Sequence, residues 1–353
     1  MQNKKRRMMI LTEGQLGVFS SKTATCLVRY CPDEVACILD SRAAKSGKPL
    51  EEFLGVGAGI PIVSSVKEGL AHKPTQLTIG IAPVGGKLPA AWRKIVLDSI
   101  RAGLDVVSGL HHILGDDKEF AAAAKRKRVR IHDVRVPPAN LDVAHDRLRA
   151  LRQRRIALVG SDCSVGKMLT AVELSNALRK RGWNSDWIAT GQTGIMIHGD
   201  GIAVDHVLSD YVNGAAEQLC YERRNKEIVV VEGQGSAYHP AYSGVTVGLL
   251  HGSMPHAMVF VHQPSRKTIG HYEQFPLPPI TQAIALCEAL TAPIYPAKVA
   301  AIALNTVDLD DAGAEKVVCE IEMETGLPAC DPIRHGAEKL AVAVENAVGK
   351  IHR

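Results

Sequence analysis

Short runs of apolar residues alternate along the chain with longer segments whose apolar residues recur every three or four positions. Short apolar runs are typical of buried strands, and the longer spacing is typical of amphipathic helices. Strands that alternate with helices indicate parallel sheets flanked by helices. In the first half of the chain the predicted strands are residues 8–11, 35–40, 60–63, 77–82, 105–110 and 129–134.

The same pattern continues to the end of the chain. Between two of the first strands, the segment 88–104 has apolar residues at helical spacing and contains Gly103, a typical helix stop. Each strand of the second half is followed by a loop rich in Gly, Ser or His, which predicts a doubly wound sheet with its site at the carboxyl ends of the strands. These strands are residues 154–160, 185–191, 227–233, 257–262 and 299–305.

A turn-rich stretch, "VPPANL" at residues 136–141, interrupts this alternation. The polar segment that follows, residues 142–155, is predicted to be a connecting helix. A chain of 353 residues is long enough for two cores. We therefore expect an α/β protein of two domains: a Rossmann-like parallel sheet in residues 1–140, and a doubly wound parallel sheet of the P-loop NTPase type in residues 141–353.

Composition limits the classes of partner. The net charge is only +5 and aromatic residues make up 4% of the chain, so nucleic acid is not an expected partner. The eight cysteines contain no C-x-x-C pair, which favours reduced thiols over disulfides or zinc. No apolar run reaches the length of a membrane span. We expect a cytoplasmic protein without a membrane partner, and a homo-oligomer, either a dimer or a tetramer.

The strongest motif is "GSDCSVGKM", which lies between a predicted strand and a predicted helix. Backbone N–H groups at a helix N-terminus, together with a lysine, bind phosphate oxygens. In the common pattern G-x-x-x-x-G-K-[ST], a hydroxyl after the lysine binds Mg²⁺, whereas here Lys167 is followed by Met168. The predicted phosphate-binding residues are Ser161, Asp162, Cys163, Ser164, Val165, Gly166, Lys167 and Met168.

Two families resemble this chain. The loop "GSDCSVGK" and the strand end "VVVEGQGS" are similar to the variant phosphate loop and the "VEGAG" strand end of dethiobiotin synthetase. The longer stretches "GQTGIMIHGDGIAVDHVLSDYVNGAAEQL", "VEGQGSAYHPAYSGVTVGLLHGSMPHAMVFVH", "GGKLPAAWR" and "AGLDVVSGLHHIL" resemble a family first defined as a domain of unknown function. Characterised members of that family are D-glutamate N-acetyltransferases of the DgcN type, which use acetyl-CoA. The resemblance spans about residues 35–345.

This second resemblance implies a ligand for a phosphate loop that lacks its hydroxyl. Coenzyme A carries phosphates that such a loop can hold without a metal ion, whereas phosphoryl transfer needs Mg²⁺. The thioether of Met168 is not a ligand for Mg²⁺, which prefers oxygen. We therefore expect acetyl-CoA as cosubstrate and no metal requirement. Asn305, in "ALNT", resembles the adenine-reading position of P-loop enzymes and is expected to contact the adenine of CoA.

Acetyl transfer to an amine needs a base that accepts the proton of the amine. Glu232 is the first candidate because it ends the most apolar strand of the second half. Two histidines at predicted strand ends, His198 and His239, are the alternatives. The histidines between residues 198 and 271 include no H-x-x-H or H-x-x-x-H pair, so a metal site is not expected.

The amino-acid substrate needs donors for its carboxylates and for the developing oxyanion. Arg266 follows a predicted strand and is the expected cation, and Gln192, Thr193 and Ser236 follow two other strands. The expected function is transfer of acetyl from acetyl-CoA to the α-amine of a small amino acid, with D-glutamate implied by the resemblance. The alternative is an ATP-dependent kinase or ligase similar to dethiobiotin synthetase, against which Met168 argues.

Overall fold

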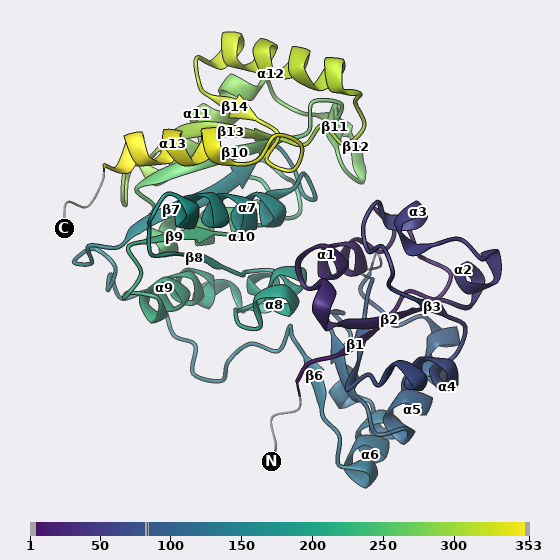
Figure 1. The fold of residues 1–353 in the computed structure, drawn as a ribbon. Helices are drawn as coiled ribbons and strands as arrows, with labels where there is room; N and C mark the ends of the chain where they lie inside the picture. The colour runs from purple at the N-terminus through teal and green to yellow at the C-terminus, as the bar shows by residue number, and fades with distance from the viewer. Residues whose placement is uncertain (1–4, 82, 84, 350–353) are drawn as a thin grey trace. The chain divides into compact units, whose positions relative to one another are not determined.

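A computed structural model describes residues 5–81, 83 and 85–349. The chain forms two compact units, Met1–Pro137 with Ile195–Asp200, and Pro138–Gly194 with Gly201–Arg353 (Figure 1). Each unit contains a six-stranded sheet, and all of the strand pairs in these two sheets are parallel. The predicted α/β class, with a Rossmann-like first sheet and a P-loop-type second sheet, is confirmed.

The first unit has the strand order β3-β2-β1-β4-β5-β6, which is the order of dinucleotide-binding Rossmann folds. All six apolar runs predicted in this half contain strands, although Ala82 of the fourth run lies outside the described residues. The strands are β1 (Met8–Leu11), β2 (Val35–Leu39), β3 (Ile62–Val63), β4 (Gln76–Ile79), β5 (Asp105–Ser108) and β6 (Ile131–Asp133). The α-helices are α1 (Lys22–Tyr30), α2 (Ser41–Ser46), α3 (Leu50–Leu54), α4 (Val66–Gly69), α5 (Arg93–Arg101) and α6 (Lys118–Lys127).

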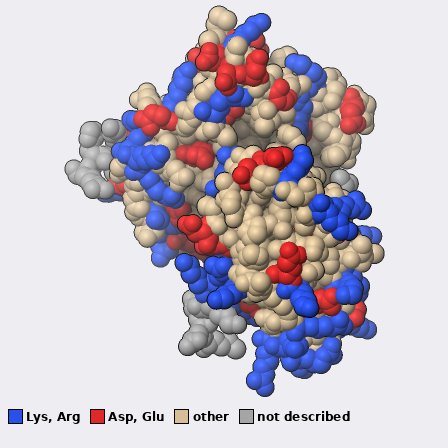
Figure 2. Space-filling view, turned by 45° about the vertical axis from the view of Figure 1, so that its right-hand side comes forward, with Lys and Arg blue, Asp and Glu red and all other residues tan. Residues whose placement is uncertain are grey.

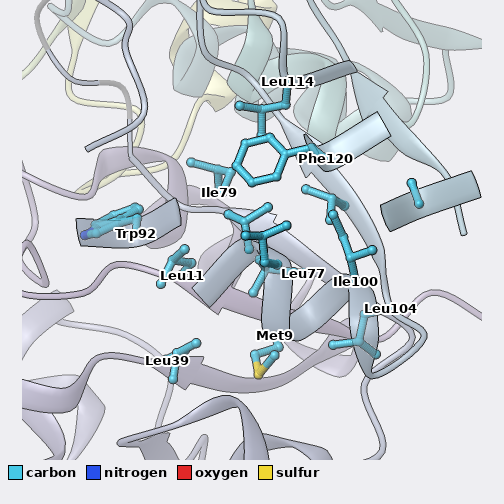
Figure 3. Packing of buried hydrophobic residues seen from close by; sticks show 14 of the residues in the cluster. Met9, Leu11, Leu39, Leu77, Ile79, Trp92, Ile100, Leu104, Leu114 and Phe120 are labelled. Atoms are coloured by element: carbon cyan, nitrogen blue, oxygen red, sulfur yellow. The ribbon is translucent and has the colours of Figure 1, made fainter. Parts of the chain in front are cut away.

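One face of this sheet packs against α5 and α6 (Figure 3). Leu77 and Ile79 of β4 are buried there together with Ile100 of α5 and Phe120 of α6. The predicted helix at residues 88–104 is observed as α5, preceded by a short 3-10 turn that buries Trp92. Burial of such side chains supplies the main favourable term in the folding of the unit.

Asp40, directly after β2, connects the loops at this end of the first sheet. Its Oδ1 accepts hydrogen bonds from the backbone N–H groups of Arg42 and Ala43, and so caps α2. Its Oδ2 accepts from the hydroxyl of Thr12 and the N–H of Gly14, in the loop after β1. The carboxylate is buried and accepts four hydrogen bonds within the unit.

The second unit has the strand order β14-β13-β10-β7-β9-β8. Helices α9 to α12 pack on one face of this sheet, and α7 and α13 pack on the other (Figure 1). The strands are β7 (Arg154–Gly160), β8 (Ser185–Ile188), β9 (Ile228–Val231), β10 (Ala257–His262), β13 (Lys298–Leu304) and β14 (Ala329–Cys330). The helices are α7 (Lys167–Lys180), α9 (Val212–Glu222), α10 (Ser243–Ser253), α11 (Ile280–Thr291), α12 (Asp311–Thr325) and α13 (Glu338–Val348). A further helix, α8 (Gln192–His198), begins in this unit, and from Ile195 on it belongs to the first.

The predicted connecting helix at residues 142–155 is wrong. This segment runs without α-helix until β7 begins. Two of its backbone N–H groups, those of His145 and Arg147, donate to the carboxylate of Glu217 on α9 rather than to carbonyls one turn earlier. Asp146 between them has φ +58°, a left-handed conformation that ends a helix. The buried carboxylate therefore outcompetes the helical hydrogen bonds of a segment that has good helix formers.

Lys and Arg side chains gather at the lower edge of the face shown in Figure 2. The basic run of the first unit, Lys125 to Lys127, is exposed in the last turn of α6. Positive side chains interact favourably with the C-terminal end of the helix dipole, so this run has a local structural explanation. Among the described residues, the helices are all too short or too polar to cross a membrane.

Candidate active site at the phosphate loop

Residues 161–166 form a tight loop between β7 and α7, at the carboxyl end of the second sheet. Gly166 has φ +115°, and a Cβ on Gly160 would lie 2.7 Å from the carbonyl oxygen of Val261 on β10. Both positions therefore need glycine. The loop ends at Lys167, whose Nζ donates to the carbonyl oxygen of Asp162 at 2.7 Å. Burial lowers the pKa of Lys167, while the nearby acidic groups oppose that shift.

No hydroxyl occupies the position after the loop lysine, because that residue is Met168. Thr170 lies two residues further along α7, and its hydroxyl donates to the carbonyl oxygen of Gly166 at 3.1 Å. This hydroxyl is buried in the helix and already bonded. These two side chains therefore offer no free oxygen ligand for Mg²⁺.

Asp162 connects this loop to a distant hairpin formed by β11 (Thr268–Ile269) and β12 (Tyr272–Pro276). Its Oδ2 accepts from the N–H of Gly270 at 2.7 Å and from Nη1 of Arg266 at 2.8 Å. The same Nη1 also donates to the carbonyl oxygen of Cys163. Arg266, predicted to bind substrate, therefore lies at the loop, where its guanidinium balances the buried charge of Asp162.

His239 lies on the other side of Asp162, with its Nε2 3.7 Å from Oδ1 of that residue. The ring is buried against Tyr242 and Tyr272. Burial lowers the pKa of His239, so the ring is neutral at pH 7. Its Nδ1 accepts the N–H of Ala241 at 3.1 Å, which assigns the proton of the neutral ring to Nε2.

One oxygen of Asp162, the sulfur of Cys163 and one ring nitrogen of His239 lie within 4.8 Å of one another, a separation that could hold a metal ion. Two contacts oppose metal binding. Asp162 already has the guanidinium of Arg266 as its partner. A metal on Nε2 of His239 would displace the proton that the hydrogen bond from Ala241 assigns to that nitrogen. In this arrangement the carboxylate of Asp162 is therefore paired with the guanidinium of Arg266.

The structure adds two side chains that the sequence did not single out. His262, at the end of β10, lies with Nδ1 2.9 Å from Oγ of Ser161, and burial lowers its pKa to about 4. Tyr238 donates its hydroxyl to the carbonyl oxygen of Ser161 at 2.6 Å. His262 ends β10 and Tyr238 lies in the loop after β9, and these two strands flank β7 in the sheet, so the sheet order brings both residues to the phosphate loop.

Glu232 directly follows β9 and is buried. One carboxylate oxygen, Oε2, accepts from the N–H groups of Thr190 at 2.8 Å and Gly191 at 3.1 Å. The other, Oε1, accepts from the side-chain amide of Gln234 at 3.2 Å. Burial raises the pKa of Glu232 to about 7, although these three hydrogen bonds and the charge of Lys167 oppose the shift.

The segment after β8, which includes the first turn of α8, approaches Glu232 very closely. A Cβ on Gly194 would lie 2.5 Å from Oε2 of Glu232, so this position requires glycine. Gln192 and Thr193, predicted to bind substrate, begin α8 in this loop, and the amide of Gln192 donates to the hydroxyl of Thr193 at 2.6 Å. The predicted donors and the predicted base therefore belong to neighbouring strand ends of one sheet.

The other three predicted site residues, Asn305, Ser236 and His198, have different surroundings. Asn305 directly follows β13, and its side chain lies 4.0 Å from the position of a Cβ on Gly166, so it borders the phosphate loop. Ser236 is fully buried, and its hydroxyl has no hydrogen-bond partner among the described residues. His198 is the last residue of α8 and belongs to the first compact unit, and its role as a base stays a prediction.

The fold and the site together define a two-unit α/β protein with a phosphate loop in its second unit. Residues 142–341 match the C-terminal P-loop domain of the DUF1611 family, a domain of unknown function, and residues 43–137 match its N-terminal Rossmann-like domain. The chain belongs to this family. A solved structure of a DUF1611 family protein from Anabaena variabilis has a TM-score of 0.91, with 39% identity over 97% of this chain and 99% of that one.

Two curated relatives have names that state an activity. A D-glutamate N-acetyltransferase of Tritonibacter scottomollicae is 38% identical over 293 residues, which cover 82% of this chain and 87% of that relative. A D-glutamate N-acetyltransferase of a Pseudoalteromonas species is 34% identical over 263 residues, which cover 74% of this chain and 79% of that relative. These findings confirm the predicted family.

Proposed function

We propose that the chain transfers the acetyl group of acetyl-CoA to the α-amine of D-glutamate. The names of its curated relatives make it an acyltransferase enzyme and support N-acetyl transfer. The donor, the acceptor and the residue roles are the parts proposed here. The domains 1–140 and 141–353, a homo-oligomer and a cytoplasmic location also stay predictions.

One observation supports the proposal above all: a phosphate loop without a Mg²⁺ hydroxyl lies beside a buried carboxyl group whose pKa is about 7. A general base is most effective when its pKa is near the working pH. Lys167 and the loop N–H groups bind a phosphate of CoA, and Asn305 contacts the adenine. Acetyl-CoA supplies the activated acyl group.

Glu232 is the proposed base, and its environment favours it over His239. The Nε2 of neutral His239 carries the proton, so this nitrogen cannot accept another one from an amine. Glu232 retains acceptor capacity and becomes charged near pH 7. Gln192, Thr193 and Ser236 are the proposed donors to the substrate. Arg266 binds a substrate carboxylate only if it releases some of its bonding to Asp162.

The test is to incubate the purified protein with acetyl-CoA and a panel of amino acids, and to follow the release of free thiol. The panel contains D- and L-glutamate, D-aspartate and D-glutamine, so that it separates chirality, chain length and side-chain charge. We expect the fastest release with D-glutamate. Release that is equal with and without amino acid would contradict acetyl transfer.

A parallel assay replaces acetyl-CoA by ATP and Mg²⁺ and follows phosphate release. Because ATP-dependent kinases and ligases also use a phosphate loop, such an enzyme is the alternative function. Met168, in place of the Mg²⁺-binding hydroxyl, argues against it. Substrate-dependent phosphate release without thiol release would establish the alternative.

A further inference from the structure

Glu232 has two carboxylate oxygens in different environments. Oε2 accepts two backbone N–H groups, from Thr190 and Gly191, and these occupy both of its lone pairs. Among the residues that the structure describes, the donor to Oε1 is the side-chain amide of Gln234. With two donors on Oε2 and one on Oε1, the lone pair left to take a proton belongs to Oε1.

Gln234 uses both amide hydrogens to fix this arrangement. Its Nε2 donates to Oε1 of Glu232 and to Oγ1 of Thr190, each at 3.2 Å. The hydroxyl of Thr190 in turn donates to the backbone carbonyl of Glu232 at 2.7 Å. A Cβ on Gly191 would lie 2.6 Å from Nε2 of Gln234, so the loop after β8 confines the amide as well. The bonds form a closed ring between the ends of β8 and β9.

We infer that Gln234 is a positioning residue that orients Glu232 so that Oε1 is the atom that accepts the proton of the substrate amine. Thr190 is a second positioning residue, because its hydroxyl accepts a hydrogen bond from the amide of Gln234 and donates one to the backbone carbonyl of Glu232. This inference rests on the proposed function of Glu232 as the base. The placement of the hydrogen bonds around its carboxylate is independent of that function.

Gln234→Met tests the inference, because methionine has a similar length and cannot donate a hydrogen bond. The amide stabilises the charged carboxylate, so its removal should shift the acid limb of the kcat profile upward by about one pH unit. The charged fraction of the carboxyl at pH 7 then falls from about one half to about one tenth, so we expect kcat to fall about 5-fold or more, with KM for acetyl-CoA unchanged. Thr190→Val should shift the limb in the same direction by a smaller amount.

Thr246→Val is the matched control. The hydroxyl of Thr246 donates to the backbone carbonyl of Gln234 at 2.7 Å and is not among the donors to the carboxylate in the described part of the chain. It perturbs the same loop without removing a donor to Glu232. Equal pH profiles for Gln234→Met and Thr246→Val would overturn the inference and leave Gln234 a role in loop order only.

Infrared difference spectroscopy gives a readout that does not depend on activity. The band of the protonated Glu232 carboxyl is identified by its loss in Glu232→Gln, and its titration midpoint is then compared with that of Gln234→Met. A shifted midpoint in a protein without acetyltransferase activity would support the positioning and contradict the proposed function. An unshifted midpoint would overturn the positioning even if the enzyme is active.

Discussion

The ammonium of Lys167 donates to the carbonyl oxygen of Asp162, five residues earlier in the same loop, at 2.7 Å. The ammonium of Lys167 therefore already has a hydrogen-bond acceptor within its own loop. A bound phosphate must therefore compete with a neutral carbonyl for the ammonium, and it does so because a charged acceptor forms the stronger hydrogen bond.

Lys167→Met should weaken acetyl-CoA binding by about 1.5–3 kcal/mol, the range for a hydrogen bond to a charged group. Isothermal titration calorimetry measures this loss, with Lys180→Ala at the exposed end of α7 as the control. Unchanged affinity for acetyl-CoA, combined with weaker binding of the amino acid, would instead place a substrate carboxylate at the loop.

Acetyl transfer should survive excess EDTA, since Met168 and the bonded hydroxyl of Thr170 provide no ligand for Mg²⁺. The measurement is thiol release before and after dialysis against chelator, with re-addition of Mg²⁺ and of Zn²⁺ as separate arms. A rate that is lost on chelation and restored by Zn²⁺ would favour a metal held by Asp162, Cys163 and His239 over the ion pair with Arg266.

Glu232→Gln should lower kcat by about 10²–10⁴-fold, the usual cost of removing a general base. In the parent enzyme kcat should rise with pH through about 7, because the carboxyl must lose its proton before it can accept one. The variant should lack this limb, and stopped assays from pH 5 to 9 will show it. If the limb persists and only KM for the amino acid rises, Glu232 is a clamp for the amine and another group is the base.

Glu232 should also make stability depend on pH. Folding raises its pKa from 4.5 to about 7, so the unfolded chain loses this proton at lower pH than the folded one. The free energy of unfolding should therefore fall as the pH rises from about 4.5 to about 7, and Glu232→Gln should remove this fall. Over the whole range the difference is roughly 3–4 kcal/mol, at 1.36 kcal/mol per unit of pKa. Urea unfolding at pH 5 and pH 8 tests it; equal losses in both proteins would contradict it.

Gly194→Ala should displace the carboxylate of Glu232, because the added Cβ would lie 2.5 Å from Oε2. We expect a loss of about 1–3 kcal/mol of stability, as for overpacked cores, and a lower kcat. Gly244→Ala in α10 is the matched control, since a Cβ there meets open space, and it should stabilise the protein by about 0.5 kcal/mol. Similar melting temperatures for the two variants would show that the loop yields without cost.

Continuous apolar runs predicted the parallel strands well, because strands buried on both faces have little need of polar residues. The phosphate loop was also predictable, since its glycines and lysine are adjacent in the chain. The connecting segment was not, because its helical pattern competes with Glu217, a partner some 70 residues away. The link from Asp162 to Arg266 and Gly270 likewise spans more than 100 residues.

The partners of Glu232 illustrate the same limit at shorter range. Gln234 is visible in the sequence two residues after Glu232, yet nothing local shows that its amide turns back to the carboxylate. Thr190 and Gly191 reach Glu232 only because β8 pairs with β9. The sequence can identify Glu232 as a candidate base. The pKa of its carboxyl group, however, depends on burial and on hydrogen bonds from residues of the neighbouring strand end.

The hydrogen bonds of Asp40 bear on which ligands the first unit can hold. In dinucleotide-binding units of the same strand order, an acidic residue near this place holds the ribose of the ligand. Here the acid lies at the end of β2, but all four of its acceptor positions serve the chain itself. A residue type that holds a nucleotide in those units here orders two loops of the protein itself, so the strand order alone does not indicate a nucleotide ligand. To restore a ribose contact, an engineer would first have to supply a new cap for α2.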